Sequence, residues 1–250
     1  MSPVEISIAS PLTALAVMVI AFAASLLAAV AGFGGAALLL PVLIAVFGTR
    51  AAIPILTLAQ LAGNGSRVWF NRRELDLRVV AWFTLGGVPL ALLGGYLFAG
   101  APLRPLTRLL GGFLLFVVIY RRMRTRPPTP PPLPAFAAIG AGASFLSALL
   151  GSVGPLMAPF FLAYGLVKGA YIGTEALATV VMHLAKLVAY HNNVLLTPTV
   201  LWTGILLSPV MIAGSWAGKR IIDRLSAAAF TRVIEATLLA AGAYFLVTGG

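Results

Sequence analysis

Long apolar runs separated by short polar stretches dominate the chain, and they predict a polytopic membrane protein built from α-helices. A helix needs about 20 apolar residues to cross the hydrocarbon core of a bilayer. Two of the runs are too short to cross alone. The apolar segments that we expect are 11–31, 36–47, 51–70, 79–98, 106–120, 135–150, 156–164, 170–189, 200–217 and 230–247.

Composition favours the same class. Hydrophobic residues make up 60% of the chain, charged residues make up 9%, and the mean hydropathy is +1.03, which excludes a protein with an ordinary water-facing surface. The net charge of +11 comes largely from Arg residues at the ends of apolar runs, so we interpret it as a topology signal and expect no nucleic-acid partner. The chain has no cysteine, which excludes disulfides and thiolate metal sites.

The two halves of the chain resemble each other. An Arg- and Pro-rich cytoplasmic linker, 121–134, separates a first transmembrane repeat at 1–120 from a second at 135–250. Residues 25–41 align with residues 144–159. Further matches hold a nearly constant offset: Asn64, Arg67 and Asn71 with His183, Lys186 and Tyr190, and Trp82, Pro89 and Gly94 with Trp202, Pro209 and Gly214.

Positively charged loops predict opposite orientations for the two halves, because short loops rich in Lys and Arg stay in the cytoplasm. Basic clusters at 67–78, 121–126 and 219–224 mark cytoplasmic loops, whereas 100–104, which corresponds to the last cluster, is nearly bare. We therefore expect an all-α fold of two inverted-topology repeats, each of about five apolar segments and each starting with a glycine-rich broken or re-entrant helix. Either eight crossings with two re-entrant segments or ten short crossings fit this pattern. Such repeats are typical of secondary transporters.

One apolar run, 170–189, carries most of the candidate chemistry. Glu175, Thr179, His183 and Lys186 fall on one stripe of the expected helix. Because ionisable groups are costly at membrane depth, such a stripe indicates a pathway for a charged substrate. We predict that Thr179, His183 and Lys186 bind substrate and that Glu175 and His183 couple protons. The alternatives are a snorkelling Lys186, a buried hydrogen-bonded His183, and a Glu175 that is a counter-ion to Lys186 or lies near the cytoplasmic mouth.

A second polar stripe, with Gln60, Asn64 and Arg67, lies on the third segment and is predicted to line the opposite wall. The alternative for Arg67 is a snorkelling position at the interface. Glycines at 32–35 and 151–154 lie where helices are expected to start, and helix starts present free N–H groups that bind anions. These turns add Gly34, Gly35 and Gly154 to the predicted substrate site, unless they serve only packing and the turn itself.

The glycine turns also carry a family resemblance. The motifs are Gly32-Phe-Gly-Gly35 followed by Pro41, Gly151-Ser-Val-Gly154 followed by Pro159, and Gly173-Thr174. Together they resemble the TauE/SafE family of sulfite and organosulfonate exporters, over about residues 26–246. The resemblance implies a carrier of small sulfur-containing anions and adds Thr174 to the substrate site. Ala36, Pro155 and Glu175 depart from the family pattern.

We therefore expect a secondary transporter of a small anion, working by alternating access, with protons as the favoured coupling ion. The alternative is a membrane-embedded enzyme or a non-transporting scaffold that uses Glu175, His183 and Lys186 as an acid–base cluster. No hydrolase, kinase or metal motif occurs in the sequence, so we expect no enzyme, no metal and no cofactor. The expected partners are the anion and the lipid bilayer, with homo-oligomers left open. The chain has 14 Arg but only 3 Lys, which is typical of a bacterium with a GC-rich genome. We therefore expect the protein in a bacterial plasma membrane, usually the inner membrane.

Overall fold

The computed structural model describes residues 11–33, 35–98, 108, 112, 115, 119, 130–151 and 153–248. All the regular secondary structure in these residues is helical, and no strand occurs among them. Helices suit this apolar chain, because each backbone N–H and C=O finds its partner within the segment. The helices are α1 (Pro11–Ala31), α2 (Gly35–Phe47), α3 (Thr49–Phe70), α4 (Leu77–Leu97), α6 (Ala135–Leu150), α7 (Gly154–Ala163), α8 (Lys168–Asn192), α9 (Pro198–Arg224) and α10 (Ala227–Thr248).

The apolar runs predicted these helices closely. The runs at 11–31 and 135–150 match α1 and α6 at both ends. α9 continues beyond its run to Arg224, because a helix can carry charged residues once it reaches the interface. The run at 106–120 lies mostly outside the described residues, as does the linker at 121–129.

The helices differ in whether they are long enough to cross a membrane. α1, α4, α8 and α9 are long and apolar enough to cross a membrane by length and composition. α2 and α7, of 13 and 10 residues, are too short to do so, as the sequence predicts. The described chain is therefore that of a multi-pass membrane protein with short apolar helices inside its bundle.

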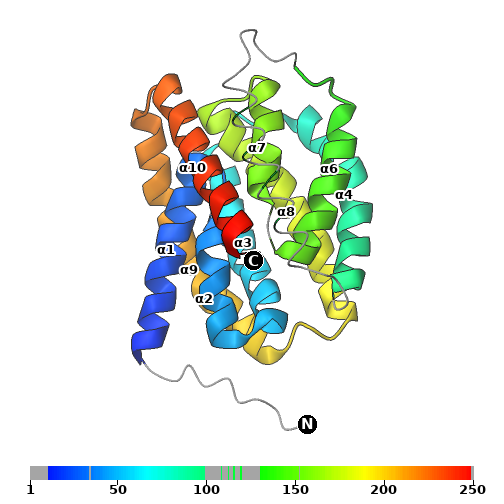
Figure 1. Cartoon of the computed structure of the whole chain (residues 1–250), viewed down its shortest axis with the longest axis vertical. Helices are drawn as coiled ribbons and strands as arrows, with labels where there is room; N and C mark the ends of the chain where they lie inside the picture. Colours follow the sequence, from blue (N-terminus) through cyan, green and yellow to red (C-terminus); the bar gives the residue numbers. More distant parts are fainter. Residues whose placement is uncertain are drawn as a thin grey trace.

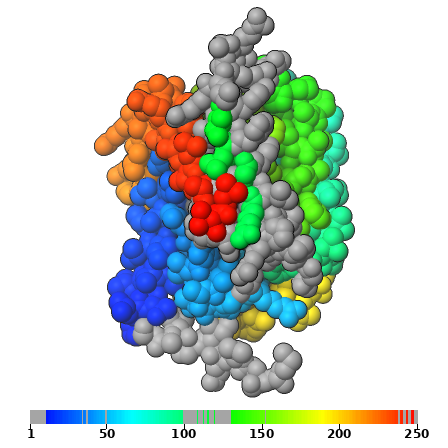
Figure 2. Space-filling model, in the orientation of Figure 1, coloured from blue at the N-terminus to red at the C-terminus, as the bar shows by residue number. Residues whose placement is uncertain are grey.

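The helices form a bundle in which α3 and α8 pack against each other at the centre (Figure 1). α1 packs on α9, and α6 packs on α4; α3 also contacts α9, and α8 also contacts α4. α1 begins at the lower end of the bundle and α6 at the upper end, while α2 lies in the lower half and α7 in the upper half (Figure 1). α10 contacts α1 and crosses the face shown in Figure 2.

Small residues let these helix pairs approach closely, as is usual in membranes. A Cβ atom on Gly86 of α4 would lie 2.0 Å from the backbone oxygen of Ala137 in α6. A Cβ atom on Gly214 of α9 would lie 2.5 Å from the backbone oxygen of Phe22 in α1. The α4–α6 and α1–α9 contacts are therefore backbone-close, and larger residues at these glycines would force the helices apart.

α1 and α6 end in the same way, at Gly32 and Gly151. Both glycines have φ +85°, a left-handed conformation that side chains disfavour. The N–H of Gly32 donates to Ala28 O at 2.8 Å, and the N–H of Gly151 donates to Ser147 O at 2.9 Å. Each glycine thus terminates its helix as a C-terminal cap, and a short helix starts a few residues later.

Candidate functional site

A small cavity lies between the two helix breaks and the central helices. Its volume is about 30 Å³, room for about two water molecules. Residues from α1, α2, α3, α7, α8 and α9 line it, so it is built from both halves of the chain. Its polar side chains are those of Ser25, Gln60, Asn64, Arg67, Glu175 and Thr179.

Arg67 supplies the cavity with a buried positive charge, being only 6% exposed. Its Nη1 donates to Ala28 O at 2.7 Å and to Gly32 O at 3.3 Å, and its Nη2 donates to Asn64 Oδ1. The guanidinium therefore holds the C-terminal end of α1, where the helix dipole favours a cation. Its Nε has no partner among the described residues. This burial excludes the snorkelling alternative for Arg67.

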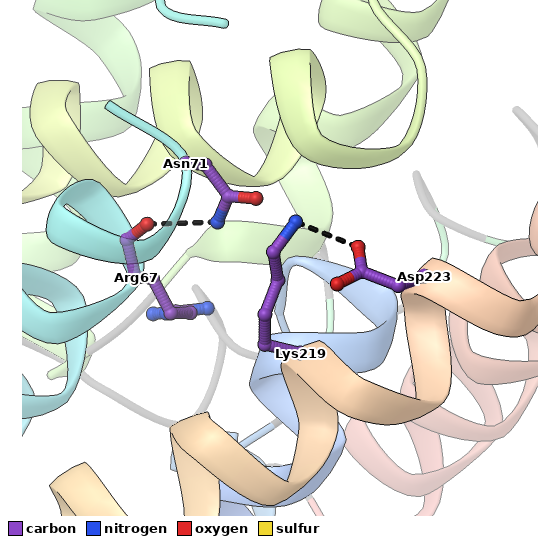
Figure 3. Close-up of polar contacts among 4 residues, drawn as sticks. All are labelled: Arg67, Asn71, Lys219 and Asp223. Atoms are coloured by element: carbon purple, nitrogen blue, oxygen red, sulfur yellow. Dashed lines mark hydrogen bonds and ion pairs between the residues drawn. The ribbon is translucent and has the colours of Figure 1, made fainter. Parts of the chain in front are cut away.

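The C-terminal end of α3 is capped by Asn71, one turn after Arg67. Asn71 follows the last residue of the helix, and its Nδ2 donates to Arg67 O at 2.8 Å (Figure 3). In the same region, Lys219 and Asp223 of α9 form an ion pair at 2.7 Å, with the Asp223 side chain 55% exposed (Figure 3). The C-terminal ends of α3 and α9, both with basic residues, therefore lie at the same end of the bundle.

Lys186 is fully buried, but it serves a different helix end and does not line the cavity. Its Nζ donates to Ser147 Oγ at 3.1 Å, to Gly151 O at 3.3 Å and to Ser147 O at 3.5 Å. Lys186 on α8 thus holds the end of α6 as Arg67 on α3 holds the end of α1. Its ammonium contacts α6 and not Glu175, so both the snorkelling and the counter-ion alternatives are excluded.

Glu175 lines the cavity and is 2% exposed. Its Oε1 accepts a hydrogen bond from Thr179 Oγ1 at 3.1 Å, while its Oε2 has no partner within the described part of the chain. A Cβ atom on Gly154 would lie 3.8 Å from Oε1. The carboxylate therefore lies beside the first residue of α7, at the positive end of that helix. No side chain caps this end.

His183 and Thr174 lie outside the cavity wall. His183 is buried and reaches the cavity only through Gln60, whose Oε1 is 3.3 Å from His183 Nε2. The hydroxyl of Thr174 accepts a hydrogen bond from the N–H of Asp76 at 2.9 Å, so it fixes the segment between α3 and α4. These positions favour a structural role for Thr174 and an indirect one for His183.

The structure thus gathers part of the predicted site and separates the rest. Glu175, His183 and Lys186 contact three different partners, so they do not form the acid–base cluster that the enzyme alternative requires. The predicted residue Gly34 lies outside the described residues. The predicted residues that line the cavity are Gly35, Gln60, Asn64, Arg67, Gly154, Glu175 and Thr179.

The sequence reasoning missed several lining residues, among them Ser25, Phe33, Met157, Met182 and Met211. Ser25 carried a signal, because it is a polar residue inside an apolar run. Its Oγ donates to Met211 O and lies 2.9 Å from Ser215 Oγ, joining α1 to α9. The methionines carried no signal, because an apolar residue in an apolar helix faces lipid, protein or cavity equally well.

Comparison with known proteins identifies one related family. The family model described as "Sulfite exporter TauE/SafE" matches residues 17–245, which include every helix named above in whole or in large part. No curated protein and no solved structure shows a significant match to the chain.

Proposed function

The chain belongs to the TauE/SafE family, and on this basis we propose that it is a secondary transporter of a small sulfur-containing anion, such as sulfite or a sulfonate. The family description suggests a membrane exporter of sulfite or related anions. We assign the protein to the inner (plasma) membrane of a bacterium. Its basic segments at 67–78 and 219–224 then face the cytoplasm.

One observation carries this proposal: a buried cation, Arg67, lies in the wall of a cavity between the central helices. A guanidinium is expensive to bury in lipid, so Arg67 would be a poor choice for packing alone. Its Nη1 and Nη2 already donate to protein oxygens, which leaves Nε as the nitrogen without a partner that could donate to an oxygen of a sulfite or sulfonate group. Its Nε and the Nδ2 of Asn64 have no hydrogen-bond partner among the described residues, so both donors are free to receive an anion.

The helix breaks supply the other half of the proposed site. α2 and α7 start beside the cavity with Gly35 and Gly154 in its wall. The positive ends of these helices therefore add to the charge of Arg67. Broken helices that point their starts at a central ligand are the usual way in which secondary transporters bind anions near the bilayer midplane.

We further propose that two inverted repeats move against each other to give alternating access. Three relations support this arrangement. α1 and α6 start at opposite ends of the bundle (Figure 1). The contacts of α1 with α9 and of α3 with α9 are paralleled by those of α6 with α4 and of α8 with α4. A buried cation of α3 holds the end of α1, and a buried cation of α8 holds the end of α6.

Protons are the proposed coupling ion, with Glu175 as the principal carrier. Glu175 is a buried carboxyl in the cavity wall, whereas His183 touches the cavity only through Gln60. A carboxyl that is alternately open to the two sides of the membrane can take up a proton on one side and release it on the other.

A thermal-shift panel tests the substrate class. Purified protein in detergent is heated with sulfite, sulfate, thiosulfate, taurine or sulfoacetate, and with acetate and chloride as controls, at matched ionic strength. A ligand at about 100 times its Kd adds about 2.7 kcal/mol of apparent stability. We expect a selective shift with at least one sulfur anion, and flux of that anion, chemically unchanged, in proteoliposomes. A flat panel combined with no sulfite or sulfonate flux would contradict the proposed function.

A further inference from the structure

We propose that Glu175 is a tethered anion that occupies the substrate's own place between Arg67 and the start of α7, so that a substrate anion binds only when this carboxyl is protonated or withdrawn. This inference rests on the proposed function and deepens it, because it makes proton uptake a condition of anion binding. It concerns one position, Glu175, the carboxyl group in the cavity wall.

The position of the carboxylate is the first argument. Glu175 is 2% exposed and lies against the first residue of α7, with its Oε1 3.8 Å from where a Cβ on Gly154 would be. It shares the wall of the cavity with Arg67. A positive helix end and a guanidinium are the two features that would attract a sulfonate or sulfite to this cavity. The side chain of Glu175 therefore already places a negative group where the substrate would bind.

Space is the second argument. The cavity has room for about two water molecules, whereas a sulfonate group brings four heavy atoms. The side chains around it that could yield are few, because Arg67 is held by Ala28 O and Gly32 O. Glu175 is held by a single hydrogen bond from Thr179. Of the two charged residues in the wall, Glu175 is thus held by fewer hydrogen bonds than Arg67.

Unpaired polar atoms are the third argument. Oε2 of Glu175, Nε of Arg67 and Nδ2 of Asn64 are all buried without a hydrogen-bond partner in the described residues. Buried polar groups are normally satisfied, so such a group of atoms indicates a site that awaits another group. The two donors suit an anion, and the free carboxylate oxygen suits a proton.

Charge balance explains why the two anions exclude each other. The ionised carboxylate and the guanidinium give the cavity no net charge, so a second anion would meet a like charge at short range in a poorly solvated space. The titratable groups around Glu175 are Arg67 of α3, which shares the cavity wall with it, and Tyr171, which precedes it by four residues on α8. The described residues of α1, α2, α7 and α9 add no titratable side chain to the wall. Protonation of Glu175 removes the like charge, and one anion then enters with one proton.

The test compares wild type with Glu175→Gln, which keeps the shape of the side chain and removes its charge. The matched control is Glu74→Gln, the same change at an exposed glutamate outside the cavity. The probe is methanesulfonate, because its own charge does not change with pH in the range used, with sulfite as a second probe. Kd is measured by titration calorimetry from about pH 5 to about pH 8, in two buffers of different ionisation enthalpy, so that proton uptake is counted directly.

We expect the wild-type Kd for methanesulfonate to rise as the carboxyl ionises, by up to about tenfold per pH unit, with uptake of about one proton per anion. Glu175→Gln should bind at every pH as tightly as the wild type does at the lowest pH, without proton uptake. Glu74→Gln should behave as the wild type. If wild type and Glu175→Gln bind with the same pH-independent Kd, the inference is overturned while the proposed function stands. If neither binds either probe at any pH, the proposed function itself fails.

A second variant keeps the inference testable should Glu175→Gln not fold. Glu175→Ala leaves a vacancy the size of a carboxylate beside Arg67 and Gly154. Formate should therefore raise the melting temperature of Glu175→Ala and leave that of the wild type unchanged. An equal response of the two proteins to formate would overturn the inference, because it would show that the carboxylate of Glu175 does not occupy an anion subsite.

Discussion

Replacing Arg67 and Lys186 one at a time with methionine separates anion binding from helix capping. Both side chains are buried cations that hold two backbone oxygens at a helix end, and methionine approximates the length of each without its charge. Only Arg67 lines the cavity. We therefore expect both variants to lose stability, and only Arg67→Met to lose its response to the anion.

The loss of stability should be similar in the two variants. Ala28 O and Ser147 O keep the bonds from the N–H groups of Gly32 and Gly151, so each substitution removes the cation's bond to one further buried oxygen, Gly32 O or Gly151 O, at about 1–3 kcal/mol. Removing a buried cation also relieves its desolvation cost, which offsets part of this loss. We expect a net decrease in the free energy of unfolding of about 1–2 kcal/mol for either variant, so Lys186→Met is a control of matched stability for Arg67→Met.

The loss of anion binding should differ sharply. Truncating one partner of a buried, hydrogen-bonded charge pair costs about 2–5 kcal/mol of binding free energy, and 2 kcal/mol corresponds to about a 30-fold rise in Kd. At an anion concentration of about 100 times the wild-type Kd, the stabilisation of about 2.7 kcal/mol would fall to about 0.9 kcal/mol or less in Arg67→Met. Lys186→Met should keep the full stabilisation.

The assay is a thermal shift of each variant with and without the sulfur anion that stabilises the wild type, at matched ionic strength. Each variant is referred to its own melting temperature without anion, so the common loss of stability cancels. A full anion response in a folded Arg67→Met protein, or a lost response in Lys186→Met, would refute the assignment of binding to Arg67 and of capping to Lys186.

Two further substitutions test the turns around the site. Gly32→Ala should lower the free energy of unfolding by about 2–5 kcal/mol, because φ is +85° and the new Cβ would lie 2.2 Å from the Tyr171 ring. The control is Gly48→Ala, where φ is +73° but no atom lies within 4 Å of the new Cβ, and it should cost only about 1–2 kcal/mol. Equal losses in a chemical-denaturation series would show that the ring does not constrain the turn. Thr174→Val should cost about 1 kcal/mol through the lost bond from Asp76 N, yet leave the anion-induced thermal shift intact. A smaller anion-induced thermal shift in Thr174→Val would show that Thr174 contributes to anion binding.

The apolar runs predicted most of the helices, because a helix satisfies every backbone hydrogen bond of a segment that lies in lipid. The polar stripe of α3 was equally readable, and Gln60, Asn64 and Arg67 do line the cavity. The hydrogen-bond partners of Arg67 and Lys186 could not be predicted from the sequence. Arg67 binds oxygens 39 and 35 residues earlier in the chain, and Lys186 does the same with α6. A backbone oxygen leaves no trace in sequence, so a buried capping cation and a snorkelling one cannot be distinguished until the helix ends are placed.

The cavity touches both helix breaks, but the proposed repeats do not contribute equivalent residues to it. At the offset that relates Arg67 to Lys186, the position equivalent to Glu175 is Leu56. Leu56 is fully buried in α3 and would lie 3.4 Å from a Cβ on Gly151. Gly151, at the end of α6, is therefore flanked by an apolar side chain, and Lys186, which caps this end, does not line the cavity. Among the described residues that line the cavity, Arg67 is the one cation and Glu175 the one carboxyl. We therefore propose a stoichiometry of one anion and one proton per cycle.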